Sequence, residues 1–222
     1  MGRITALYTT SIISGFCMMA LEILGARVLQ PFFGSGIDVW AAIISIFILS
    51  LSVGYWIGGR IADKASSNRP LACVIIIAAI CYLLLPIWAR PFLEALGPTV
   101  HTARGGVLLA SLILFLPPSL LLGCVSPLLV KLVFMGAERV GRSTGTLYAV
   151  GSFGNVMGIL VADFVLLVHF DLNHSIIGMG IAMGLMGTLH LLIPIAGTSE
   201  RVTVVGAAPG AVAPAVEAEQ AR

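Results

Sequence analysis

Four polar residues stand inside long apolar runs of this sequence: Glu22, Arg27, Asn155 and Asp163. An ionisable side chain is costly in a hydrocarbon environment, so it usually faces the interior of a helix bundle or a water-filled cavity. The chemistry that such residues support is ion pairing, ligand binding or proton transfer. These four positions are therefore the first candidates for a structural or ligand-binding polar cluster.

Arg27 and Asp163 are one base and one acid that we place at similar depth in two different helices. We expect them to form an ion pair, because the long arginine side chain can reach a neighbouring helix. One interpretation is a structural pair that fixes the register of the two helices. The other is a binding cavity or proton relay, in which Glu22, if it is left unpaired, is the better functional candidate.

Metal, haem and nucleophile chemistry are not expected. The cysteines, Cys17, Cys73, Cys81 and Cys124, form no CxxC motif, which favours small buried hydrophobic side chains. A bis-histidine haem needs ligands at matching depth, and His169 and His174 lie at the opposite edge of the membrane from His190. Neither GxxxxGK[ST] nor GxSxG occurs. We therefore expect no cofactor and no enzymatic activity in this chain.

The elements that must position these residues are transmembrane helices. Hydrophobic residues make up 59% of the chain and charged residues only 10%, whereas soluble domains carry about 25% charged residues. A span needs roughly 20 apolar residues. The sequence predicts an all-α integral membrane protein with six spans, at residues 6–29, 39–57, 71–88, 107–134, 146–170 and 176–195.

The fourth of these spans contains Pro117, Pro118 and Pro127, which predict a kinked or broken helix. With one span here, most basic residues fall on one side: Arg3, Arg60, Lys64, Arg69, Lys131, Arg139, Arg142 and Arg201. The other side has Arg90 and Arg104, with Arg27 near its edge. This positive-inside bias predicts that both termini are cytoplasmic. Residues 1–195 form the transmembrane domain, and 196–222 are expected to be a disordered cytoplasmic tail.

Small residues recur at helical spacing in the last two spans. Gly154 and Gly158 form one GxxxG pair, and Gly180 and Gly184 form another. Such pairs allow close approach of two helices, either within the chain or across a dimer. Intramolecular packing is the favoured interpretation.

Three stretches, residues 14–34, 54–64 and 141–155 running on to 164–167, together resemble the membrane domain of the fused major-facilitator/spermidine-synthase-like proteins. The resemblance implies a bundle like one half of a major-facilitator transporter. Within it, Gly59, Arg60, Asp63 and Lys64 resemble the charged cytoplasmic loop between the second and third helices. Fused members carry a Rossmann-like synthase domain after the membrane part. Up to Arg222 no such domain follows, so we expect no aminopropyl transfer here.

Three functions remain open. The first is a non-catalytic membrane subunit or anchor that binds a partner, such as a separate synthase-like protein. The second is a half-size secondary transporter that dimerises and carries a small metabolite or a polyamine. The third is a subunit of a larger membrane complex, such as respiratory or photosynthetic machinery. In each case we expect a multi-pass protein of the bacterial inner membrane, in contact with lipid. The net charge of +2 gives no reason to expect nucleic acid.

Overall fold

The computed structural model describes residues 3–97, 104–134 and 140–192 of the chain, and in these ranges the elements are helices. They are α1 (Arg3–Phe33), α2 (Ile37–Lys64), α3 (Arg69–Ala95), α5 (Arg104–Phe134), α6 (Val140–Val161), the π-helical turn η1 (Ala162–Leu166), α7 (Leu167–His169) and α8 (Leu172–Leu192). Six stretches are long and apolar enough to cross a membrane, and α6, η1 and α7 together make the fifth. The predicted all-α, six-span membrane fold is confirmed. The predicted tail, 196–222, lies outside the described residues, as do Arg139 and Arg201.

The fourth span is continuous at its three prolines. α5 runs as one helix through Pro117, Pro118 and Pro127, so of the two predicted forms, kinked or broken, the broken one is excluded, and the count of one span holds. Proline is tolerated in such helices because neighbouring helices and hydroxyl side chains satisfy the backbone groups that it frees.

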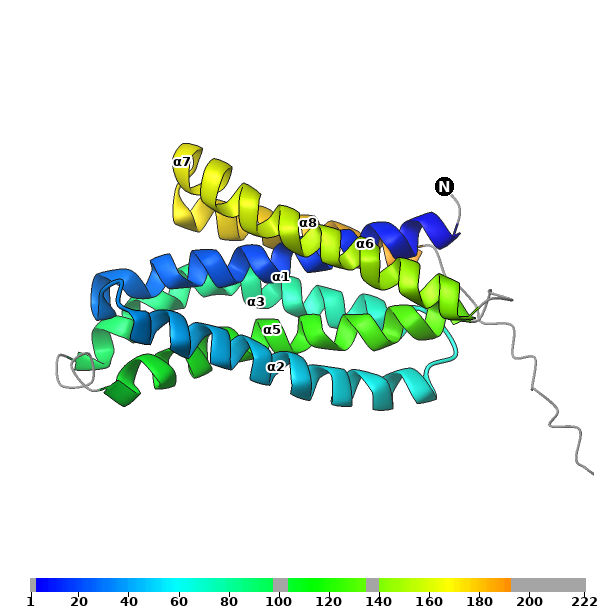
Figure 1. Ribbon diagram of the computed structural model, residues 1–222, viewed down its shortest axis with the longest axis horizontal. Coiled ribbons are helices and arrows are strands. Elements are labelled where there is room, and N and C mark those ends of the chain that lie inside the picture. The colour runs from blue at the N-terminus through cyan, green and yellow to red at the C-terminus, as the bar shows by residue number, and fades with distance from the viewer. Residues whose placement is uncertain (1–2, 98–103, 135–139, 193–222) are drawn as a thin grey trace, which may run out of the picture.

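The helices run side by side along the long axis of the bundle (Figure 1). We call the end where α1 begins the proximal end and the end where α1 finishes, at Phe33, the distal end. α1 is closed at the distal end by Gly34, whose φ of 77° is the left-handed conformation that glycine adopts at helix ends. Its N–H donates to the carbonyl of Gln30 over 2.9 Å.

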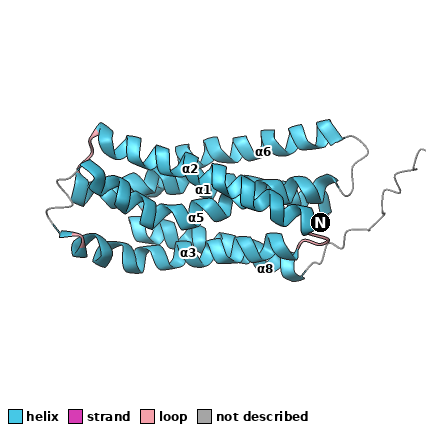
Figure 2. Cartoon of the chain, turned by 90° about the horizontal axis from the view of Figure 1, so that it is seen from below, coloured by secondary structure: helices cyan, strands magenta, loops and turns pink. Residues whose placement is uncertain are grey.

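Packing pairs each helix with one from the other half of the chain. α1 packs on α6, α2 on α5, and α3 on α8, and the central helices α1 and α5 also contact each other. Figure 2 shows α3 and α8 along one edge of the bundle and α6 along the opposite edge. Successive helices along the chain make fewer contacts than these pairs do.

Two of these pairs have the same crossing geometry. Where α6 crosses α1, a Cβ added at Gly154 would meet the carbonyl of Ile12, and one added at Gly158 would meet that of Phe16. Where α2 crosses α5, a Cβ at Gly54 would meet the carbonyl of Leu120, and one at Gly58 would meet that of Cys124. Both GxxxG stripes therefore hold backbones in contact within the chain.

The two crossings correspond residue by residue. Gly54 and Gly58 precede Gly154 and Gly158 by 100 residues, and the carbonyls that they meet, on α1 and α5, are 108 residues apart. The sequence shares the motif S-x-G-x-x-x-G-x-x-x-A-D, at 52–63 and at 152–163. α1–α3 and α5–α8 are therefore an internal repeat. Each repeat has three spans, so the two copies have opposite directions in the membrane.

The third pair obeys the same relation. Gly180 of α8 packs on Leu83 of α3, and Gly187 packs on Ile76. With a spacing of 104 residues, Ile76 corresponds to Gly180 and Leu83 corresponds to Gly187. Gly184, which the sequence grouped with Gly180, lies 3.8 Å from Ala79 when a Cβ is added. When each residue is replaced by its counterpart in the other repeat, one contact becomes the other. This is the property of an approximate twofold axis perpendicular to the helices.

One side of the bundle is open. Only 17% of the apolar window of the fifth span is buried, compared with 39–56% in the other five. This span and α2 carry large exposed side chains, among them Tyr55, Trp56, Tyr148 and Phe153. α2 and α6 are counterparts in the repeat, so they form two equivalent rims of the open side.

Candidate functional site

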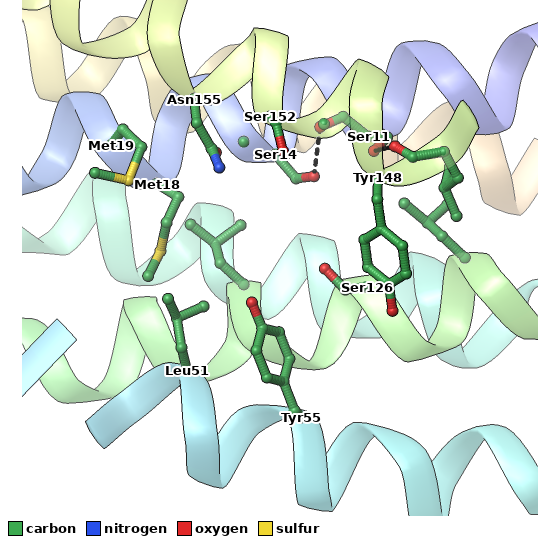
Figure 3. A pocket seen from close by; sticks show the side chains of 15 residues that line it. Ser11, Ser14, Met18, Met19, Leu51, Tyr55, Ser126, Tyr148, Ser152 and Asn155 are labelled. Atoms are coloured by element: carbon green, nitrogen blue, oxygen red, sulfur yellow. Dashed lines mark hydrogen bonds between the residues drawn. The ribbon is translucent and has the colours of Figure 1, made fainter. Parts of the chain in front are cut away.

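A pocket of about 160 Å³ lies on the open side, with walls from α1, α2, α5 and α6 (Figure 3). Its lining residues are mostly small or polar: Ser11, Ser14, Gly15, Met18, Met19, Leu51, Tyr55, Leu122, Ser126, Leu129, Leu147, Tyr148, Gly151, Ser152 and Asn155. None of them carries a charge. The pocket therefore offers hydroxyl and amide groups in a part of the bundle that otherwise buries apolar side chains.

The two rims contribute aromatic hydroxyls. Tyr55 projects from α2 and Tyr148 from α6, and their hydroxyls lie on either side of Ser126 in the same space (Figure 3). Asn155 lies at the other end of the pocket, beside Met18 and Met19. With Ser11 and Ser14 of α1, the polar groups thus reach the pocket from four different helices.

Hydrogen bonds within the chain use only some of this polar capacity. The Ser11 hydroxyl donates to the carbonyl of Leu147, and that of Ser14 to the carbonyl of Ser11, each over 3.2 Å. A hydroxyl group both donates and accepts, and an amide has two of each capacity. Ser126, Ser152 and Asn155 therefore have capacity for a ligand or water.

The pocket lies on the axis of the internal repeat. Leu51 and Gly151 are counterparts, Tyr55 is the counterpart of Asn155, and Met18 is the counterpart of Ser126. Equivalent positions of the two repeats therefore line the pocket, and the two repeats run in opposite directions through the bundle. In transporters built from inverted repeats, the binding site lies at this kind of position, near the bilayer midplane.

Of the four predicted polar residues, Asn155 alone lines the pocket. Glu22 is half-buried on α1, and it follows Met18 and Met19 by four and three residues. That spacing places it on the same helix face, one turn nearer the distal end. Among the residues that the structure describes, none forms an ion pair with Glu22.

The predicted ion pair between Arg27 and Asp163 is confirmed as a contact. The guanidinium lies 3.9 Å from the carboxylate, and the two side chains are 50% and 49% exposed. Asp163 stands in η1, where the wider turn interrupts the regular helix. Such turns often mark functional positions. The pair lies toward the distal end, outside the pocket.

Asp163 is the counterpart of Asp63, 100 residues earlier. Gly59, Arg60, Asp63 and Lys64 belong to the last two turns of α2, so the predicted charged loop is the end of a helix. The Arg60 guanidinium stacks on the Trp56 ring at 3.7 Å from its centroid. The repeat thus places one aspartate near each end of the bundle.

Exchanging Asp163 for asparagine is expected to lower stability by less than about 1 kcal/mol, because the pair is long and half-exposed. A double-mutant cycle with Arg27→Gln, read from thermal unfolding midpoints in detergent, isolates the pair from other effects. A coupling energy above zero and up to about 1 kcal/mol in the cycle would support the pair. Strictly additive single changes would show that the two side chains do not interact.

A buried polar network that the sequence did not reveal ties the proximal end together. His190 of α8 is 3% exposed, and its Nε2 lies 2.7 Å from the hydroxyl of Thr10 on α1. That hydroxyl donates to the carbonyl of Ala6, so the imidazole is the donor to it. Asn68 donates its amide to the carbonyl of His190 over 2.6 Å. The sequence did not predict this network, because the partners of His190 come from distant parts of the chain.

A larger cavity, of about 590 Å³, has less claim to be the site. It opens at the distal end between α1, α3 and α8, near Arg27 and Arg90. Both arginines already have acidic partners, since Arg90 contacts Glu94 at 2.9 Å. In the described ranges no group of three or more His, Cys, Asp or Glu side chains could hold a metal ion.

Neither a family model, nor a curated protein, nor a solved structure matches this chain. The geometry of the chain itself must therefore carry the functional inference.

Proposed function

We propose that this chain is one half of a dimeric secondary transporter for a small solute. The observation that carries the proposal is the polar pocket on the axis of the inverted repeat. A repeat of this kind gives the two ends of the bundle similar packing. Exchange of one packing for the other opens a central site to either side of the membrane in turn.

The open side explains why the unit is proposed to be a dimer. Hydroxyl and amide groups exposed to hydrocarbon are costly, so lipid is a poor cover for the pocket. A partner must instead fit two rims, α2 and α6, that are equivalent by the repeat. A second copy offers the same two rims, so a twofold dimer can place α2 against α6 of its partner on both sides.

The proposed orientation follows the basic residues. Arg60, Lys64, Arg69, Lys131 and Arg142 belong to helix ends at the proximal end, whereas Arg27 and Arg90 lie toward the distal end. The positive-inside rule then favours a cytoplasmic proximal end, in a bacterial inner membrane. Both termini would be cytoplasmic.

The membrane-anchor hypothesis is the alternative. Its support is the resemblance to fused synthase-like proteins, which bears on a partner at the cytoplasmic face. It gives no role to a polar pocket in the interior of the bundle. We therefore rank it second.

The test is the access of water-soluble reagents to the pocket, which needs no knowledge of the solute. In a chain with its four cysteines replaced by alanine, a single Ser152→Cys is exposed to a membrane-impermeant thiol reagent from each side of a vesicle. A transporter is expected to be labelled from both sides. Ile80→Cys, on the outward face of α3, is the matched control and should remain unlabelled.

Labelling of Ser152→Cys from one side alone, or from neither, would contradict transport and favour the anchor. Size-exclusion chromatography of both variants shows that they are folded before the labelling is compared.

A further inference from the structure

We propose that the pocket on the repeat axis binds a small uncharged solute rich in hydroxyl groups, such as a short polyol. This inference rests on the proposed transport function, and it names the chemical class of the solute. It differs from the polyamine that the family resemblance favours.

The first support is the chemistry of the lining. Four serines, two tyrosines and one asparagine face the pocket, without a charged side chain among the lining residues. Hydroxyl groups donate and accept at once, as the hydroxyls of a polyol do, so each partner can satisfy the other. An ion would lose its hydration here without gaining a counter-charge, which is a large penalty.

The second support is the arrangement of the polar groups. The hydroxyl of Ser126 lies between those of Tyr55 and Tyr148, and Asn155 stands at the end of the pocket away from Tyr148 (Figure 3). Polar groups at both ends match a ligand that carries hydroxyls along its whole length. The methionine side chains of Met18 and Met19 lie beside Asn155 and supply an adaptable apolar wall for its carbon chain.

The third support is size. The pocket measures about 160 Å³, whereas sites for drug-sized ligands span roughly 300–1,000 Å³. The space that one chain supplies therefore fits a molecule of a few carbon atoms.

A polyamine fits this lining less well. Its ammonium groups require carboxylates, and the nearest acidic side chain along α1 is Glu22, which lies one turn beyond the lining residues. Asp163 is already in contact with Arg27. The charge of Glu22 is therefore the feature that separates the two ligand classes experimentally.

The experiment measures saturable binding of radiolabelled erythritol to the purified full-length protein in nanodiscs, with unlabelled glycerol, spermidine and sodium chloride as competitors. We expect glycerol to compete and spermidine not to compete. Tyr55→Phe and Asn155→Leu should each weaken erythritol binding by about tenfold, since each removes hydrogen-bonding capacity from one end. Glu22→Gln should leave it unchanged.

Thr188→Val is the matched control, because Thr188 is exposed on α8 and its hydroxyl donates to the carbonyl of Gly184 in its own helix. Each variant is first compared with the unmodified protein by its thermal midpoint. Where Asn155→Leu fails to fold, Ser126→Ala replaces it and should also weaken binding.

Competition by spermidine that Glu22→Gln abolishes would overturn the polyol assignment in favour of a cation. So would the lack of saturable erythritol binding in a chain whose Ser152→Cys variant is labelled from both sides, which leaves the transport proposal standing. Erythritol binding with labelling from one side only would instead support the site and reject transport.

Discussion

Gly58→Ala is expected to destabilise the protein by about 1–3 kcal/mol, while the same substitution at the adjacent Gly59 should raise stability by up to about 1 kcal/mol. A Cβ at Gly58 would lie 2.6 Å from the Cα of Cys124 and 2.7 Å from its carbonyl oxygen. Backbone atoms of a packed helix cannot move aside as the end of a side chain can. At Gly59 nothing lies within 4 Å of the added atom.

Comparing Gly58→Ala with Gly59→Ala separates the steric effect from the change in helix propensity. Both sites are helical, so both gain the roughly 1 kcal/mol by which alanine exceeds glycine in helix propensity. Thermal midpoints measured by fluorescence-detected chromatography after heating report the difference. Equal midpoints for the two variants would show that α2 and α5 are not in close contact here.

The internal repeat extends this prediction to the second crossing. Gly158→Ala should cost a similar amount, because its Cβ would meet the carbonyl of Phe16. Gly145, on the same helix α6, has nothing within 4 Å and is the matched control. A large loss at Gly58 with none at Gly158 would contradict the equivalence of the two crossings.

The second large effect is expected at the rim of the open side, where Val156→Trp should convert a dimer into monomers. Val156 is 53% exposed and follows Ser152 of the pocket by one helical turn. If α2 of a second copy packs there, the indole cannot be accommodated without separating the two helices. If lipid covers this surface, the larger apolar side chain is tolerated.

Ile80→Trp is the control, because Ile80 is 47% exposed on α3, away from the open side. Native mass spectrometry after purification in mild detergent measures the oligomeric state of each variant. We expect dimers for the unmodified chain and for Ile80→Trp. The dimeric transporter would be rejected if the unmodified chain and both variants were monomers. A stoichiometric complex with a soluble synthase-like protein would also reject it, and either result would support the anchor.

Much of the fold could be predicted because hydrocarbon thickness constrains the sequence directly. Apolar runs of the required length identify the six spans, although the helices extend past the predicted ends into interfacial positions, as α2 does to Lys64. The prolines of α5 predicted a kink or a break, and the sequence could not decide between them because the cost of a proline depends on neighbouring helices. The π-helical turn at Asp163 was not predicted.

The site was predictable only in part. Asn155 and the Arg27–Asp163 contact could be inferred because polar groups are rare in such spans. The serines and tyrosines of the pocket are ordinary in apolar helices, and only the tertiary packing brings them together. The repeat was detectable, since residues 52–63 and 152–163 share five identical positions, but a comparison of the chain with itself at 100 residues was needed.

The cross-pairing of the helices has a consequence for biogenesis. The three principal pairs, α1 with α6, α2 with α5 and α3 with α8, all join one repeat to the other. We therefore expect the first three helices to meet their main packing partners only after the second three have been inserted during synthesis. Assembly is then expected to be a late event, in which the duplicated halves complete each other.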